Sequence, residues 1–216
     1  MRVAVMQPYL YPYPLYFHLV ASVDLFILFD CVQFPRRGRI HRAPLPGHNW
    51  LTLPLARQPR ETLIQDLTFA PEADALWAAR LEALPWLSKE MKEHLFTPFA
   101  PSVTAYLETQ LQRACAMLGI TTPLRRSSSL GLRRDLRGQD RVIAASRAVG
   151  AQTYVNLPGG RDLYNAKEFR DHDLQLAFLA PYAGARFSML HALSTEPTRV
   201  LRAELAHLPS PEEVQP

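Results

Sequence analysis

Polar residues that could do chemistry lie directly after two short apolar segments near the start of the chain. Gln7 follows the segment Arg2–Met6, and Asp30 follows the segment Leu25–Phe29. Ligands of open α/β sheets bind outside the carboxyl ends of the strands, so both positions are candidate site residues. A carboxylate is a candidate general base, and an amide suits the orientation of a hydroxyl or a carbonyl. The structural alternatives are that Gln7 braces the proline-rich loop after it and that Asp30 pairs with an arginine.

The arginines form two groups, which are candidate anion-binding regions. Six arginines and no acidic residue lie between positions 36 and 60, and a second group of six lies between positions 125 and 141. A guanidinium presents a rigid fork of donors that suits phosphate, so we predict a phosphorylated small-molecule ligand, contacted by Arg37 and Arg42. Solvated surface is the alternative, and Arg37 or Arg42 could instead pair with Asp30. No recognised nucleic-acid-binding motif accompanies the charge, so nucleic acid is not an expected partner.

Two histidines close to these residues are candidate proton carriers. His18 lies one turn into a predicted helix, and His41 lies inside the first arginine group. The place of His18 is similar to that in nucleotidylyltransferases of the HxGH class, although Phe17 stands where that motif has glycine. Simple packing is the alternative for His18. Cys31 is interpreted as a small apolar side chain, because the carboxylate of Asp30 beside it disfavours a reactive thiolate.

Later parts of the chain supply further candidate ligand contacts. Gly159 and Gly160 follow a predicted strand and could let backbone N–H groups approach an anion or a sugar, with a tight turn as the alternative. Ser127–Ser129 end another predicted strand at the same edge and could donate hydrogen bonds to a ligand. The predicted ligand contacts besides the arginines are Tyr11, Gln33, Ser128, Gly159, Gly160, Arg161 and Asp162.

Alternating strand-like and helix-like segments predict an α/β protein with a mostly parallel sheet and a helical insert. The predicted strands are Arg2–Met6, Leu25–Phe29, Trp50–Leu55, Leu63–Phe69, Leu124–Ser127, Thr153–Asn156 and Leu174–Phe178. Helices are predicted from about Leu15 and at 71–84, Ser88–Phe96, 102–118, Asp140–Val149, Asn165–Arg170, Ser188–Leu193 and Thr198–Leu205. Trp50–Leu55 and Leu63–Phe69 are expected to pair with each other, and Asp30–Asn49 is expected to be a long functional loop.

Length and composition predict how the chain is organised. A chain of 216 residues with 48% hydrophobic composition predicts one α/β domain over residues 1–207, with the helical insert at about 71–118. Residues 208–216 are proline-rich and aperiodic, which predicts a flexible tail. No apolar stretch approaches the ~20 residues of a spanning helix and no signal-peptide pattern is present, so we expect a cytoplasmic protein. Cys31 and Cys115 form no metal-ligand or disulfide pattern, so no metal is predicted, and the sequence specifies no cofactor.

Several motifs, in their order along the chain, resemble the WbqC-like protein family. They are Val3–Pro12, Tyr16-Phe17, Asp24, Asp30–Phe34, Trp50–Pro54, Pro158–Gly160 and Asp162. Met6 departs from the pattern, because a histidine usually precedes Gln-Pro there, and His191 stands where an aspartate is common. A thioether cannot carry protons near neutral pH, so either another histidine, His18 or His41, takes over any base role, or this chain differs in substrate.

The resemblance implies a role in surface-polysaccharide biosynthesis of the O-antigen type, in which an acyl or aminoacyl group is attached to an amino sugar. We expect a transferase acting on a nucleotide-activated amino sugar, with an acyl donor as second substrate. In this hypothesis arginines hold the diphosphate, Asp30 is the base for the attacking amine, and Gln7 positions that amine. A nucleotidylyltransferase and a non-catalytic sugar-nucleotide-binding protein are the alternatives. The hypothesis requires Gln7, Asp30 and the glycine pair to border one positively charged cavity.

Overall fold

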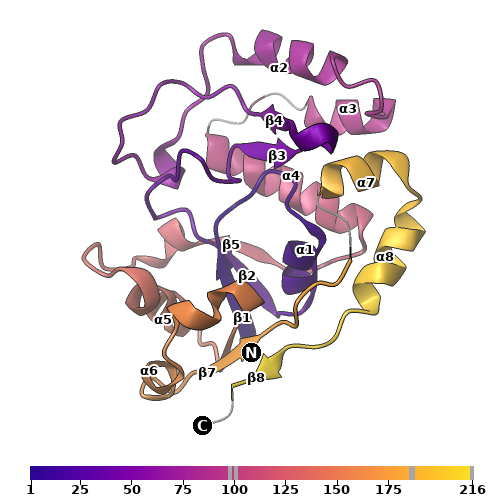
Figure 1. Cartoon of the computed structure of the whole chain (residues 1–216). Coiled ribbons are helices and arrows are strands. Elements are labelled where there is room, and N and C mark those ends of the chain that lie inside the picture. The colour runs from indigo at the N-terminus through magenta and orange to yellow at the C-terminus, as the bar shows by residue number, and fades with distance from the viewer. Residues whose placement is uncertain (97–98, 100–101, 185–187, 215–216) are drawn as a thin grey trace.

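A six-stranded sheet organises the computed structural model, which describes residues 1–96, 99, 102–184 and 188–214 (Figure 1). The strands, in their order across the sheet, are β5 (Leu124–Arg126), β2 (Leu25–Leu28), β1 (Arg2–Met6), β6 (Thr153–Asn156), β7 (Gln175–Phe178) and β8 (Glu212–Glu213). All neighbouring strands pair in parallel except β7 and β8, which are antiparallel. The predicted α/β fold class with a mostly parallel sheet is confirmed.

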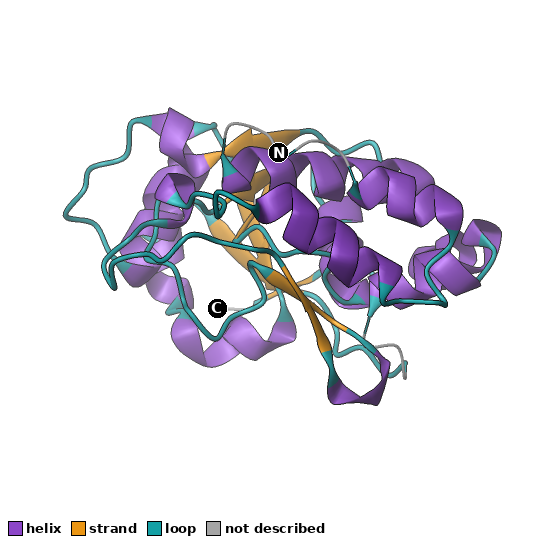
Figure 2. Cartoon of the chain, turned by 90° about the horizontal axis from the view of Figure 1, so that it is seen from above, coloured by secondary structure: helices purple, strands orange, loops and turns teal. Residues whose placement is uncertain are grey.

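Helices cover both faces of this sheet, as Figure 2 shows with the strands between two groups of helices. Ala4, Phe26 and Leu28 face the larger core, and Val3, Val5 and Ile27 face the smaller one, as the twofold period of a strand requires. The larger core includes residues of α1 (Pro14–Ala21), α4 (Val103–Met117), α7 (Met189–Thr195) and α8 (Thr198–Ala206). The smaller core includes residues of α5 (Gly138–Ala148) and α6 (Ala166–Arg170). Strands buried on both faces explain the continuous apolar runs in the sequence.

The segment between β2 and α2 differs most from the sequence-based prediction. β3 (Arg42–Pro44) and β4 (Trp50–Thr52) form a two-stranded antiparallel sheet joined by η1 (Pro46–His48). The prediction that Trp50–Leu55 pairs with a strand at Leu63–Phe69 is wrong, because β4 pairs with β3 and the second segment contains η2 (Ile64–Asp66). A single bridge between Leu55 and Phe69 is all that remains of that pairing in the described chain. We call residues 33–60 the arm.

Helix ends follow local sequence signals. α2 (Ala73–Glu82) and α3 (Lys89–Leu95) precede α4, whose first turn is capped by Ser102, with its hydroxyl accepting from the Ala105 N–H at 3.1 Å. Gly119 ends that helix with φ +73°, a conformation that residues with a Cβ rarely adopt. None of the helices in the described part of the chain is long and apolar enough to cross a membrane.

The C-terminal segment, which the sequence predicts to be a flexible tail, forms a strand and a contact with α1 in its described part. β8 extends the sheet by pairing Ala177 with Glu213 and Phe178 with Glu212. The Pro209 carbonyl oxygen lies 2.9 Å from Nε2 of the buried His18, so the segment also contacts α1. Residues 215 and 216 of the predicted tail lie outside the described residues.

Candidate functional site

Polar residues from adjacent strands meet at the carboxyl edge of the parallel sheet. The strand order puts the ends of β5, β2, β1 and β6 side by side, and these are followed by Ser127, Asp30, Gln7 and the loop that begins at Pro158. Parallel neighbours end at the same edge, so the predicted convergence of these segments follows from the topology. Their side chains differ in what they contact.

Asp30 is buried, with 1% of its surface exposed, and its carboxylate is fully engaged by the segment after β5. Oδ1 accepts from the Ser127 hydroxyl at 2.9 Å and from the Ser128 N–H at 2.8 Å. Oδ2 accepts from the Ser128 hydroxyl at 2.7 Å. A base must reach the proton that it takes, so this carboxylate is better suited to joining β2 to η3 (Ser127–Leu130) than to contacting substrate.

The arginines predicted as partners of Asp30 contact other groups. Arg42 donates from Nε to the Gly38 carbonyl at 2.9 Å and from Nη2 to the Arg37 carbonyl. Among described residues no ion pair includes Asp30, so the predicted pairing with Arg37 or Arg42 is wrong. The carboxylate is instead stabilised by uncharged hydrogen-bond donors of Ser127 and Ser128.

Gln7 and Tyr11 differ in their availability to a ligand. Gln7 is half-buried at the end of β1; its carbonyl accepts from the Tyr16 hydroxyl at 2.8 Å, and its side-chain amide has no hydrogen bond to any described residue. Tyr11 is buried, and its hydroxyl donates to Gln110 Oε1 at 3.2 Å. Tyr11 therefore connects the proline-rich loop to α4. The side-chain amide of Gln7, in contrast, has both its N–H donors and its oxygen acceptor free to bond to a ligand.

A cavity of about 450 Å³ lies in the arm and is lined by Gln33, Phe34, Pro35, Arg36, Arg37 and Arg60. Its two walls are joined by bonds from Gln33 Nε2 to the Arg60 carbonyl at 2.9 Å and from Arg36 Nη2 to the Gln58 carbonyl at 2.8 Å. None of its three arginines forms an ion pair with a described residue. Of the predicted contacts, Gln33 and Arg37 line this cavity, and Gln7, Tyr11, Asp30 and the glycine pair do not. The expectation that Gln7, Asp30 and the glycine pair border one positively charged cavity is therefore not met by this cavity.

His41 does not line this cavity but contacts Phe34, which does. Its ring is 5.1 Å from the ring of Phe34, edge to face, and its Nδ1 is buried without a hydrogen-bond partner in the described part of the chain. Burial and, secondarily, the charge of Arg42 lower the pKa of His41 below 6.5. The imidazole is therefore neutral at physiological pH and keeps a lone pair for a proton.

His18 has none of the features needed to hold nucleotide phosphates. It is the fifth residue of α1, away from the helix N-terminus, and its Nε2 is occupied by the Pro209 carbonyl. The comparison with HxGH nucleotidylyltransferases therefore gains no support from its position.

The loop after β6 forms η4 (Pro158–Leu163), in which Gly160 has a packing role and Gly159 does not. A Cβ on Gly160 would collide with the Asn156 side chain and lie 3.3 Å from Tyr164 Cε2, whereas nothing lies within 4 Å of a Cβ on Gly159. The Arg161 guanidinium lies over the Phe178 ring at 4.8 Å, and Asp162 is exposed. Only close packing at Gly160 demands glycine here.

Replacing Gly160 by alanine is expected to lower the free energy of unfolding by about 1–3 kcal/mol, the usual effect of forcing extra volume into a packed site. The buried Asn156 cannot retreat easily, because its Oδ1 accepts from the Leu157 N–H at 2.8 Å. The matched variant G159A places its methyl group in open space and should unfold at nearly the same urea concentration as the original chain. Equal stability of the two variants would contradict this packing role.

The sequence-based prediction did not single out Arg141, which connects the segment after β2 to the loop before α5 by hydrogen bonds. It is buried, and its guanidinium donates to the carbonyls of Leu136 at 2.9 Å, Cys31 at 2.6 Å and Arg134 at 2.9 Å. Arg126 pairs with Glu108 at 2.7 Å. Arg126 and Arg141 of the second arginine group are thus engaged in internal contacts, whereas three arginines of the arm line one cavity together.

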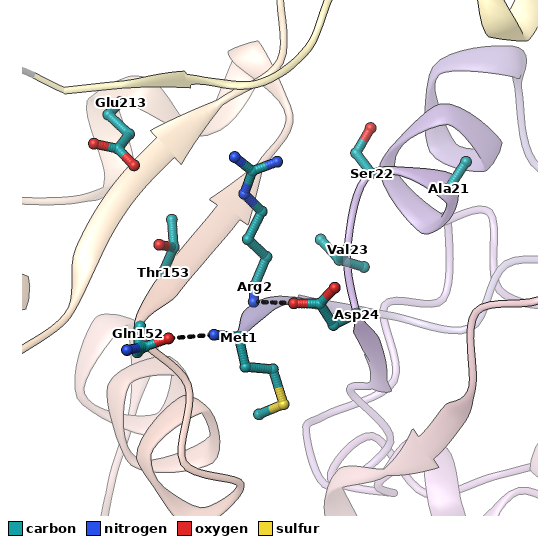
Figure 3. Close-up of a pocket in the computed structure, with 9 residues that line it drawn as sticks. All are labelled: Met1, Arg2, Ala21, Ser22, Val23, Asp24, Gln152, Thr153 and Glu213. Atoms are coloured by element: carbon teal, nitrogen blue, oxygen red, sulfur yellow. Dashed lines mark hydrogen bonds between the residues drawn. The ribbon is translucent and has the colours of Figure 1, made fainter.

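A second cavity, of about 420 Å³, lies at the opposite edge, where β1 begins (Figure 3). Arg2 extends its side chain between Ser22 and Glu213, and its backbone N–H donates to Asp24 Oδ2 at 2.7 Å. No predicted site residue lines it. Neither cavity holds a metal-ligand cluster, since no group of His, Cys, Asp and Glu residues that could bind a metal occurs among the described residues.

Fold and site together define an α/β protein with an arginine-lined cavity beside the carboxyl edge of a parallel sheet. The chain belongs to the WbqC-like protein family, whose model matches residues 7–191. It is similar to "Uncharacterized protein Rv1507c" of Mycobacterium tuberculosis, with 26% identity over 204 residues that cover 86% of this chain and 84% of that protein. No solved structure matches the chain.

Proposed function

We propose that this protein is an acyl- or aminoacyl-transfer enzyme whose acceptor is an amino sugar carried by a nucleoside diphosphate, in surface-polysaccharide biosynthesis of the O-antigen type. The observation that carries the proposal is the arm cavity, which gathers Arg36, Arg37 and Arg60 without a carboxylate. Guanidinium groups bind phosphate through paired, charge-assisted hydrogen bonds. The cavity volume of about 450 Å³ also lies within the ~300–1,000 Å³ of ordinary small-molecule sites.

The acceptor amine needs a base, and His41 suits this role better than the buried Asp30. In the proposed step the amine attacks the acyl carbonyl carbon, the bond from that carbon to the donor's leaving group breaks, and the amine proton passes to His41. His41 is half-buried and neither of its ring nitrogens bonds to a described residue, so its lone pair is unoccupied; its ring also contacts Phe34, which lines the cavity. Gln7 lies outside the lining of the arm cavity and has no role in this step.

His41 is expected to titrate with a pKa below 6.5, because burial and the Arg42 charge both disfavour its protonated form. The imidazole Cε1 proton, assigned with H41Q and followed by NMR against pH, measures this directly. Activity that depends on neutral His41 should fall as pH decreases through the same lowered value. R42Q should raise the pKa of His41, and R42K, which keeps the charge, should not. A pKa of 6.5 or above for His41 in the original chain would contradict the expected effect of burial and Arg42.

Incubation with nucleotide-linked amino sugars and activated acyl or aminoacyl donors tests the activity. The expected result is an increase in the mass of the acceptor by one acyl group, lost in H41Q. Ligand-induced stabilisation without turnover would favour the second candidate, a non-catalytic sugar-nucleotide-binding protein, for which Met6 in place of the family histidine is the supporting observation. The proposed ligands are cytoplasmic metabolites, and the free thiols of Cys31 and Cys115 agree with a reducing compartment.

A further inference from the structure

A second cationic feature of the arm lies outside the arginine-lined cavity and involves Arg39. Its guanidinium carbon lies 5.4 Å from the centroid of the Tyr13 ring and 5.8 Å from that of the Trp50 ring. Its Nη1 is buried and has no hydrogen-bond partner among the described residues. A charged donor removed from water without an acceptor is costly, so such a group calls for an explanation beyond stacking.

The neighbouring groups do not supply the missing acceptor. Burial raises the pKa of Tyr13 to about 12, and it also raises the pKa of Tyr9, so both hydroxyls stay neutral and neither is a counter-anion for Arg39. No acidic residue occurs between positions 36 and 60. The charge of Arg39 therefore faces aromatic rings and no carboxylate within its own segment.

Arg42 differs from Arg39 although both contact the same indole. Its guanidinium carbon lies 4.4 Å from the Trp50 centroid, but its Nε and Nη2 are engaged by the carbonyls of Gly38 and Arg37. Trp50 itself remains 39% exposed, so a ligand can reach the ring. The cluster thus offers one unsatisfied charged donor beside an accessible aromatic surface.

We infer that Arg39, Tyr13 and Trp50 form a receptor for a carboxylate attached to an apolar or aromatic group. A carboxylate can accept from two N–H groups of one guanidinium, and none of those of Arg39 bonds to a described residue, whereas a phosphate dianion would bring a second negative charge next to the aromatic rings. The rings would contact the apolar part of the ligand. Arg42 links this cluster to Arg37 of the arm cavity, so an organic acid bound here lies next to the proposed diphosphate site. The inference stands whether or not that cavity binds a nucleotide.

Benzoate titration tests the receptor, with the Trp50 indole N–H signal in NMR as the readout, assigned through W50F. Benzoate is expected to shift this signal, and benzamide, its neutral counterpart, is expected not to. In R39Q the affinity for benzoate should fall by at least about tenfold, the usual effect of losing one charge-assisted hydrogen bond. R57Q removes an exposed arginine from the same arm and should bind benzoate like the original chain.

Equal shifts with benzamide and benzoate, or unchanged benzoate affinity in R39Q, would overturn the inference. A response to phenyl phosphate but not to benzoate would overturn the choice of a carboxylate. If R39Q fails to fold, the comparison of benzoate with benzamide on the original chain still shows whether the site requires a carboxylate. Pyrophosphate added to the same samples probes the arm cavity separately, so failure there and failure at Arg39 are distinguishable.

Discussion

Replacing Asp30 by alanine should lower the free energy of unfolding by about 3 kcal/mol or more, because hydrogen bonds to a buried carboxylate are lost and their donors keep no partner. The Ser127 hydroxyl and both Ser128 donors bond to this carboxylate at 2.7–2.9 Å. For a chain of this length the loss corresponds to a decrease of roughly 6–12 °C in melting temperature. Urea unfolding followed by circular dichroism measures the change.

Two variants separate this effect from the loss of an arbitrary aspartate. D30N keeps the size of the side chain and one acceptor oxygen, so it should be destabilised less than D30A. D135A removes an exposed carboxylate paired with Arg133, a kind of pair that contributes little to stability, and should leave the unfolding curve unchanged. The structural role of Asp30 is excluded if D30A unfolds at the same urea concentration as D135A.

Removing two arginines of the arm cavity should weaken binding of a nucleoside-diphosphate sugar by about hundredfold, since each charge-assisted contact to phosphate is worth about a factor of ten. The double variant R37Q/R60Q tests this, because both side chains line the cavity, are exposed, and form no ion pair among the described residues. Isothermal titration at fixed ionic strength gives the affinities. Pyrophosphate should compete with the sugar nucleotide for the original chain.

The control R147Q/R170Q makes the same change in net charge on α5 and α6, on exposed residues that do not line the cavity. It should retain the original affinity apart from a small, salt-dependent decrease. If the two double variants lose equal affinity, the net charge of the protein, and not the cavity, governs binding. The proposed diphosphate site would then be wrong.

Local sequence signals predicted those parts of the fold that depend on neighbouring residues. Thr153–Asn156 forms β6 with the predicted bounds, because a short buried run bounded by turn residues fits a central parallel strand. Ser102 caps α4, and Gly150 after α5 has φ +72°, as a helix C-terminus favours.

Parts of the fold that depend on distant pairing were not predictable in this way. β3 and β4 have three residues each, which is too short for a clear periodic pattern. Pro44 and Pro46 further weaken the strand signal of β3, because proline is unusual in strands. Leu63–Phe69 has strand-like composition, but η2 and its contact with α4 determine its structure, as in the bond from the Thr104 hydroxyl to the Ile64 carbonyl at 3.1 Å. Tertiary contacts outweigh local propensity in such segments.

The sequence indicated candidate site residues and did not indicate their contacts. Strand ends identified Asp30 and the serines after β5 separately, but no sequence rule joins residues that are 97 or 98 positions apart into one network. The arginine excess of the arm was visible in the sequence, whereas the cavity between Gln33–Arg37 and Arg60 depends on the bonds that hold its two walls. Asp30 and His41 differ as bases because the Asp30 carboxylate accepts three hydrogen bonds and the His41 ring has no partner among the described residues. Periodicity does not report the hydrogen bonds of a single polar residue.

A crystal structure with a nucleotide-linked amino sugar tests the central claim most directly. The account predicts the diphosphate within hydrogen-bonding distance of Arg36, Arg37 and Arg60, and the sugar amine directed toward His41. A ligand bound in the cavity beside Arg2 at the opposite edge of the sheet, or no binding at concentrations that saturate other sugar-nucleotide proteins, would contradict it.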